Sequence, residues 1–180
     1  MSAVLAFESP DLTLAGINQL DRVRFVAALG GVFEHSPWVA TGAWAERPFA
    51  SIDHLHRTMM DVVRATSREV RIDFLRMHPE LAGKEAQAGT MTGHSTTEQA
   101  GLNALSRDQL QTLRGLNAAY AAKHGFPFVI AVLANTRAQI FEALRARTAR
   151  DTDTELEAAL EQIAIITRLR LGRLLASPVM

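Results

Sequence analysis

Residues 155–175 read ELEAALEQIAIITRLRLGRLL, and this stretch predicts a long helix that begins after Thr154. Its apolar residues recur at intervals of three and four, which is the spacing of one buried helix face: Leu156, Leu160, Ile163 and Ile166. The next position on that face is Arg170. Because a buried guanidinium without a partner is costly, we expect Arg170 either to pair with an anionic or strongly polar group or to extend its charge into solvent.

Signals for helix starts and ends recur along the rest of the chain, whereas alternating strand patterns are scarce. Ser36 followed by Pro37 is typical of a helix start. Ser106 precedes another amphipathic helix, and Gly125 is typical of a helix end. We therefore predict an all-α protein of roughly eight helices. Since the chain has no internal repeat or linker, residues 1–180 are expected to form a single compact domain.

Composition limits the class of protein further. The chain has 180 residues, 48% of them hydrophobic, which suits one domain with a substantial core. Its 19 basic and 19 acidic residues cancel, so nucleic acid and membrane surfaces are not expected partners. No cysteine is present, which excludes disulfides and thiolate ligands. With no signal-like start, no peroxisomal ending and no run of roughly 20 apolar residues, we expect a cytoplasmic protein.

Two segments are harder to interpret from sequence. Leu81–His94 is rich in glycine and alanine and has no clear periodicity, so it is predicted to be a loop. Phe128–Leu133 is strongly apolar and lies between Pro127 and Asn135. Its length suits either a buried helix or an extended strand, and we favour a helix.

Polar clusters flank the predicted loop, with His78-Pro79 at one helix end and residues 95–99 at the next helix start. A histidine in a last helical turn interacts favourably with the helix dipole, but it also titrates near neutrality and can exchange protons with a substrate hydroxyl. A capping box that begins at residue 95 explains Glu98 but leaves Gln99 unexplained. We interpret the two clusters as one candidate site.

Other kinds of site have little support. His54 and His56 point to different sides of their predicted helix, and the remaining histidines share no ligand spacing, so no metal site is expected. The chain has no GxGxxG, phosphate-loop or GxSxG motif, which leaves nucleotide binding and serine hydrolysis without a signal.

Five short motifs, in order over most of the chain, resemble the OHCU decarboxylase family, which acts on 2-oxo-4-hydroxy-4-carboxy-5-ureidoimidazoline (OHCU) in urate breakdown. These motifs are FEHSPWVATGAWAERPF (33–49), HPELAGK (78–84), STTEQAGLN (95–103), LNAAYAAKHGFPFVI (116–130) and RLRL (168–171). The resemblance implies an all-helical, often dimeric enzyme that forms (S)-allantoin from this small-molecule substrate without a cofactor.

The resemblance also implies which residues form the site. The catalytic residues would be His78, as proton donor or acceptor, and Glu98. The substrate-binding residues would be Pro79, Ser95, Thr96, Thr97, Glu98, Gln99, Phe128, Val129, Ile130, Ala131, Val132 and Arg170.

The chemistry of this substrate explains why no cofactor is expected. Decarboxylation leaves an electron pair on carbon, and the adjacent ring C=N bond of OHCU can accept it. The protein then needs only to orient the substrate and to move protons. We expect His78 to exchange a proton with the C4 hydroxyl, and Glu98 and Gln99 to hold the ureido and ring amides. Arg170, assisted by residue 95, would bind a carbonyl or carboxylate edge.

Two alternatives remain open at this point. In a noncatalytic helical interaction module, His78, Glu98 and Arg170 would serve as caps and structural ion pairs. In an enzyme of the same fold, the pocket would accept a different ureide or cyclic amide. A catalytic site requires the three side chains to face one cavity, whereas structural caps point anywhere.

Overall fold

The computed structural model describes residues 12–102 and 104–175, and over these residues the fold is all-α, with no strand. Eight of its α-helices have seven residues or more, as predicted, and two are shorter. The α-helices are α1 (Leu14–Gln19), α2 (Arg22–Leu29), α3 (Pro37–Ala43), α4 (Ile52–Arg64), α5 (Arg68–Arg76), α6 (Lys84–Ala88), α7 (Gly93–Gln99), α8 (Arg107–His124), α9 (Arg137–Thr148) and α10 (Thr152–Leu174). Short 3-10 helices are η1 (Trp44–Glu46), η2 (Ala100–Leu102) and η3 (Val132–Ala134). The features predicted for the two chain ends lie outside the described residues.

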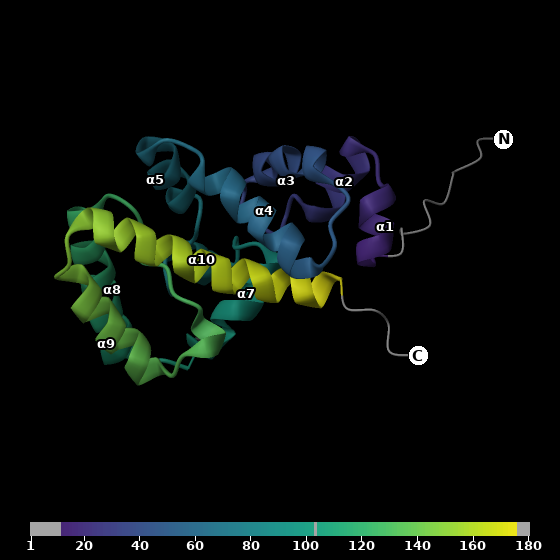
Figure 1. Ribbon diagram of the computed structural model, residues 1–180. Helices are drawn as coiled ribbons and strands as arrows, with labels where there is room; N and C mark the ends of the chain where they lie inside the picture. Colours follow the sequence, from purple (N-terminus) through teal and green to yellow (C-terminus); the bar gives the residue numbers. More distant parts are fainter. Residues whose placement is uncertain (1–11, 103, 176–180) are drawn as a thin grey trace.

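The long helix α10 crosses the molecule and contacts α4, α5 and α8 (Figure 1). On one side of it, α2, α3 and α4 pack against one another, and at its start α8 and α9 lie side by side. None of the described helices is long and apolar enough to cross a lipid bilayer.

The buried face predicted for α10 is present. Leu156, Leu160 and Ile163 are buried in the core, and burial of each contributes roughly 1.5 to 3 kcal/mol. Ile166 is only half-buried because it lines a pocket. The helix begins earlier than predicted, since the side chain of Asp151 rather than Thr154 caps it.

The predicted loop Leu81–His94 was partly wrong, because it contains α6 and the start of α7. The predicted capping box from Ser95 to Glu98 was also wrong. Thr92 is the N-cap of α7, and its hydroxyl accepts a hydrogen bond from the backbone N–H of Ser95. Ser95 and Glu98 therefore lie within the helix, where their side chains are free for tertiary contacts.

The helix favoured for Phe128–Leu133 was wrong as well. Residues 128–131 have no regular secondary structure, and the end of the predicted segment belongs to the short 3-10 helix η3. Pro127 cannot donate a backbone hydrogen bond, and remote side chains bond the peptide groups that a helix would pair internally. Arg147 donates to the carbonyl of Val129, and Gln162 accepts from the N–H of Ala131. These contacts replace local helical hydrogen bonds.

Candidate active site

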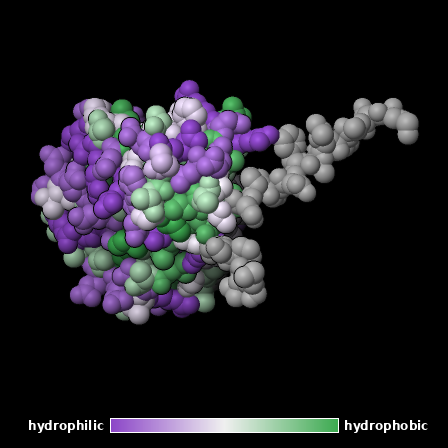
Figure 2. Space-filling model, turned by 45° about the vertical axis from the view of Figure 1, so that its right-hand side comes forward, coloured by the Kyte–Doolittle hydropathy of each residue, from purple (hydrophilic) through white to green (hydrophobic). Residues whose placement is uncertain are grey.

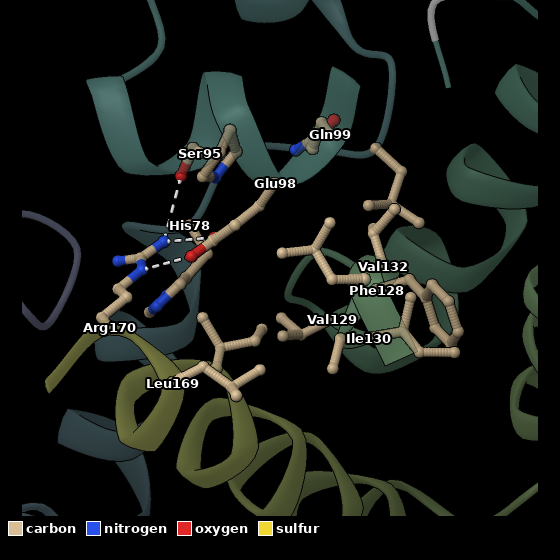
Figure 3. A pocket seen from close by; sticks show the side chains of 15 residues that line it. His78, Ser95, Glu98, Gln99, Phe128, Val129, Ile130, Val132, Leu169 and Arg170 are labelled. Carbon is tan, nitrogen blue, oxygen red and sulfur yellow. Dashed lines mark hydrogen bonds and ion pairs between the residues drawn. The ribbon is translucent and has the colours of Figure 1, made fainter. Parts of the chain in front are cut away.

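One pocket collects most of the predicted site residues. Its empty space, which includes the solvent-open mouth, is about 530 Å³. Four parts of the chain form it: the loop after α5, helix α7, the segment around η3, and the last third of α10 (Figure 3). The lining residues are His78, Pro79, Leu81, Ser95, Glu98, Gln99, Phe128, Val129, Ile130, Ala131, Val132, Leu133, Ile166, Leu169 and Arg170.

Helix α7 turns only some of its residues toward the pocket. Ser95, Glu98 and Gln99 are spaced three and four apart, so they share one helix face, and all three line the pocket. Thr96 and Thr97 are exposed and do not line it. The hydroxyl of Thr97 donates to the carbonyl of Gly93 within the same helix. The two threonines expected to bind substrate therefore lie away from the cavity.

His78 lies just after α5 and is buried against the ring of Phe74, with ring centroids 5.3 Å apart. Its Nδ1 is 3.2 Å from the carbonyl oxygen of Phe74. Because a carbonyl can only accept, Nδ1 carries the proton and Nε2 is left as an acceptor. Burial lowers the pKa of His78 from 6.5 to about 4, partly opposed by the charge of Glu34. At neutral pH His78 is therefore an uncharged base.

The lowered pKa of His78 should make the protein less stable in acid. The unfolded chain binds a proton at this histidine near pH 6.5, whereas the folded chain binds it only near pH 4. The contribution of His78 to stability is present above pH 6.5 and is lost as the pH falls toward 4. We expect the difference in unfolding free energy between wild type and His78→Asn to change by roughly 2 to 3 kcal/mol across this window.

Urea unfolding of both proteins at several pH values between 4 and 7 measures this change. The exposed His94 provides a control, because His94→Asn should leave the pH dependence of the wild type unaltered. Parallel pH curves for wild type and His78→Asn would contradict the prediction.

Arg170 is buried, as the spacing on α10 suggested, and it has two carboxylate partners. Its Nε and Nη2 donate to the two carboxylate oxygens of Glu98, at 2.8 and 2.7 Å. Its Nη1 donates to Glu34 at 3.0 Å and to the carbonyl of Val32 at 3.1 Å, and Nη2 also reaches the hydroxyl of Ser95 at 3.4 Å. A guanidinium has five N–H groups, so each of them has a protein acceptor here.

Glu34 was missed by the sequence analysis. It lies between α2 and α3, is almost fully buried, and accepts a hydrogen bond from the hydroxyl of Thr92, the cap of α7. Burial disfavours its charged form, but the bonds from Thr92 and Arg170 outweigh this and hold the pKa of Glu34 below its usual value. With Glu98, it gives the Arg170 cluster one net negative charge. The sequence feature that could have pointed to Glu34 is its position directly after the apolar pair at 32–33, where a buried carboxylate would need a partner.

Gln99 presents donors to the pocket. Its Oε1 accepts a hydrogen bond of 2.9 Å from the backbone N–H of Ala82, which adopts a positive φ of 47°. The amide nitrogen of Gln99 therefore remains available for a ligand oxygen. Asn117 fixes the same loop from α8 by donating to the carbonyl of Leu81. Within residues 12–102 and 104–175, no group of three or more His, Asp or Glu side chains is arranged to hold a metal ion.

The convergence of these side chains on one pocket favours a catalytic site over a noncatalytic interaction module. An all-α fold that places a buried histidine and an arginine–carboxylate cluster at one mostly apolar pocket is the arrangement expected of a small-molecule enzyme. The sequence profile of one family, described as OHCU decarboxylase, matches residues 18–172. The chain belongs to the OHCU decarboxylase family, and the resemblance inferred from the five motifs is confirmed.

Individual relatives agree with this assignment. The chain is 41% identical to the 2-oxo-4-hydroxy-4-carboxy-5-ureidoimidazoline decarboxylase of Haloferax volcanii, with 93% of this chain and 98% of that protein covered. A crystal structure of (S)-allantoin synthase superposes with a TM-score of 0.70 at 26% identity, over 90% of this chain and 53% of the other. An OHCU decarboxylase crystallised in the presence of (S)-allantoin shares the fold, with a TM-score of 0.63 at 21% identity, over 87% and 99% of the two chains.

Proposed function

We propose that this protein is a carboxy-lyase that converts OHCU to (S)-allantoin and CO2 in urate breakdown, without a cofactor. The observation that carries the proposal is the meeting of His78, Glu98 and Gln99 at one small, mostly apolar pocket. The family membership of the chain supports the same reaction.

The reaction balances without an external electron acceptor. The bond from C4 to the carboxylate breaks, and its electron pair forms a double bond to the adjacent ring carbon. The electrons of the ring C=N bond move to nitrogen, which takes up one proton. The C4 hydroxyl then loses its proton as the C4 carbonyl forms, and the adjacent carbon gains a proton. Delivery of this last proton to one face of the ring produces a single enantiomer.

His78 is suited to receive the proton of the C4 hydroxyl. Its Nδ1–H is engaged by the carbonyl of Phe74, and its low pKa keeps Nε2 unprotonated at neutral pH. The protonated imidazole then returns the proton to the intermediate. The amide nitrogen of Gln99 donates to a substrate carbonyl, while the carboxylate of Glu98 accepts from ureido N–H groups.

For Arg170 we infer a role that differs from the one expected from sequence. Because all five of its N–H groups have protein acceptors, it is not free to bind the substrate carboxylate unless it gives up a bond. We infer that Arg170 orients Glu98 through the two-oxygen pairing. The long contact to Ser95 is the one that a substrate carbonyl would replace most readily.

A direct assay tests the proposed reaction. Freshly generated OHCU is mixed with the protein, and the loss of substrate absorbance is followed together with optical rotation. We expect accelerated loss of substrate and a single enantiomer of allantoin. Racemic product formed at the spontaneous rate would refute the proposal, and heat-denatured protein supplies the background rate.

We further propose that the protein is a cytoplasmic homodimer with no nucleic-acid or membrane partner. Its balanced charge supports the absence of such partners. One face has apolar side chains gathered within a mostly polar surface (Figure 2). The large apolar residues that are exposed on the described surface are Val23, Val70, Met77, Leu133, Ile165 and Leu169. Light scattering coupled to size-exclusion chromatography should give a molar mass twice the 19.7 kDa of one chain. A molar mass equal to that of one chain would exclude the dimer.

A further inference from the structure

The pocket wall formed by residues 128–131 is buried, although it is neither helix nor strand. Buried peptide groups outside regular structure need hydrogen-bond partners from elsewhere in the fold. Three side chains supply them. Arg147 on α9 donates to the carbonyl of Val129 at 2.9 Å, and Gln162 on α10 accepts from the N–H of Ala131 at 3.0 Å. Asn135 donates to the carbonyl of Ala131 at 2.9 Å.

These three side chains contact the wall from the side away from the substrate pocket. None of them lines that pocket, and all three line a second cavity between α9 and α10. Ile130 lines both cavities, so the wall separates the two. The hydrogen bonds from behind therefore fix the wall without occupying the substrate side.

Arg147 is itself held by a buried network. Its Nε donates to Glu155 at 2.7 Å, and the hydroxyl of Tyr120 donates to the same carboxylate at 2.6 Å. The guanidinium also lies 4.5 Å from the ring centroid of Phe128, so it contacts two adjacent wall residues. Buried ion pairs contribute little net stability because their desolvation offsets their attraction. A positioning role explains why this one is placed directly behind the wall.

The N–H and the C=O of Ile130 are the backbone groups left for a ligand. Each belongs to a trans peptide group whose other end, the Val129 C=O or the Ala131 N–H, is bonded from behind, so each points the opposite way. Neither the N–H nor the C=O of Ile130 has a hydrogen-bond partner among the described residues, whereas Val129 and Ala131 are bonded on either side. A ureide offers N–H and C=O groups next to each other, which complements the free N–H and C=O of one residue.

We propose that Arg147 and Gln162 are positioning residues that hold the wall from behind, so that the N–H and the C=O of Ile130 face the ureide of the substrate. This inference rests on the proposed function for the identity of the ligand. It assigns a task to two side chains that do not touch the substrate.

Gln162→Leu tests the inference with little risk to folding, because Gln162 is only partly buried. The substitution removes the acceptor for the Ala131 N–H at similar size. We expect KM for OHCU to rise roughly fivefold to tenfold with kcat nearly unchanged, because the wall binds the ground state and the transition state alike. Gln162→Glu keeps an acceptor oxygen and should restore KM. Glu161→Gln is the matched control, since Glu161 lines the same cavity and no hydrogen bond to the wall is found for it among the described residues.

Amide hydrogen exchange does not depend on catalysis, so it tests this inference separately from the proposed function. Amide hydrogen exchange at Ala131 should be faster in Gln162→Leu than in wild type, and slow again in Gln162→Glu. The double variant Arg147→Met/Glu155→Gln removes the other fixed point without leaving an uncompensated buried charge, and it should raise KM similarly. Unchanged exchange and unchanged KM in Gln162→Leu would overturn the inference. Inactive wild type with the expected exchange pattern would refute the proposed reaction but leave the holding of the wall intact.

Discussion

His78→Asn is expected to lower kcat by roughly a hundredfold or more while the protein remains folded. The asparagine amide can still donate to the carbonyl of Phe74, but it cannot take up and return a proton. The loss should fall mainly on kcat, because proton transfer from the C4 hydroxyl occurs in the transition state and the binding contacts of Gln99 remain.

Steady-state kinetics with fresh OHCU, together with circular dichroism to verify folding, measures the effect of His78→Asn. His94→Asn is the matched control, because His94 lies on α7 close to the site but is exposed. Turnover within a few fold of wild type in the His78 variant would remove His78 from the mechanism.

Arg170→Met is expected to lower the free energy of unfolding by about 3 to 5 kcal/mol and to remove most of the activity. The reason is electrostatic. The side chains of Glu34 and Glu98 are 1% and 13% exposed, and both depend on this one guanidinium for compensation. Without it, two carboxylates remain buried close together. Since protonation would relieve this repulsion, the loss of stability should shrink as the pH is lowered.

Arg168→Met is the matched control for Arg170→Met. Arg168 lies on the same helix and pairs with Asp53 at the surface, where ion pairs contribute about 0 to 1 kcal/mol. Urea unfolding of the two variants at pH 7 and at pH 5 measures the difference between them. Equal losses for the two variants would show that the buried cluster has little energetic importance. A loss for Arg170→Met that does not depend on pH would contradict the electrostatic explanation.

The net charge of the cluster also bears on substrate binding. In the proposed reaction, two carboxylates and one guanidinium with no free N–H would not attract a substrate carboxylate, so we expect that group to lie against the apolar side of the pocket. Its loss as CO2 would then relieve the burial of its charge. The ureide end of the substrate, by contrast, is expected to lie against Gln99 and Glu98, which offer donors and acceptors.

Much of the fold was predictable because its signals are local. Ser106 and Gly125 begin and end α8 as predicted, the first by a capping box and the second with a left-handed backbone. Hydrogen bonds between residues three or four apart decide such caps, so the neighbouring sequence contains the necessary information. Helix periodicity also put Arg170 on the buried face of α10, but it left open whether the guanidinium is paired in the interior or reaches solvent.

The partners of these residues were decided only by tertiary packing. Glu34 is 136 residues from Arg170, and Gln162 is 31 residues from Ala131, so no local pattern links them. Even the cap of α7 depends on packing, since Glu98 pairs with Arg170 rather than with its own helix start.

The sequence by itself therefore determined an all-α chain with an arginine on a buried helix face, and by resemblance it indicated the histidine and the polar helix that form the site. Only the tertiary structure decided that this arginine is saturated by two carboxylates and that side chains of α9 and α10 hold the opposite wall. The physical reason is range: helix periodicity and caps act over a few residues, whereas buried charges and irregular peptide groups take whichever partners the packed elements bring within hydrogen-bonding distance.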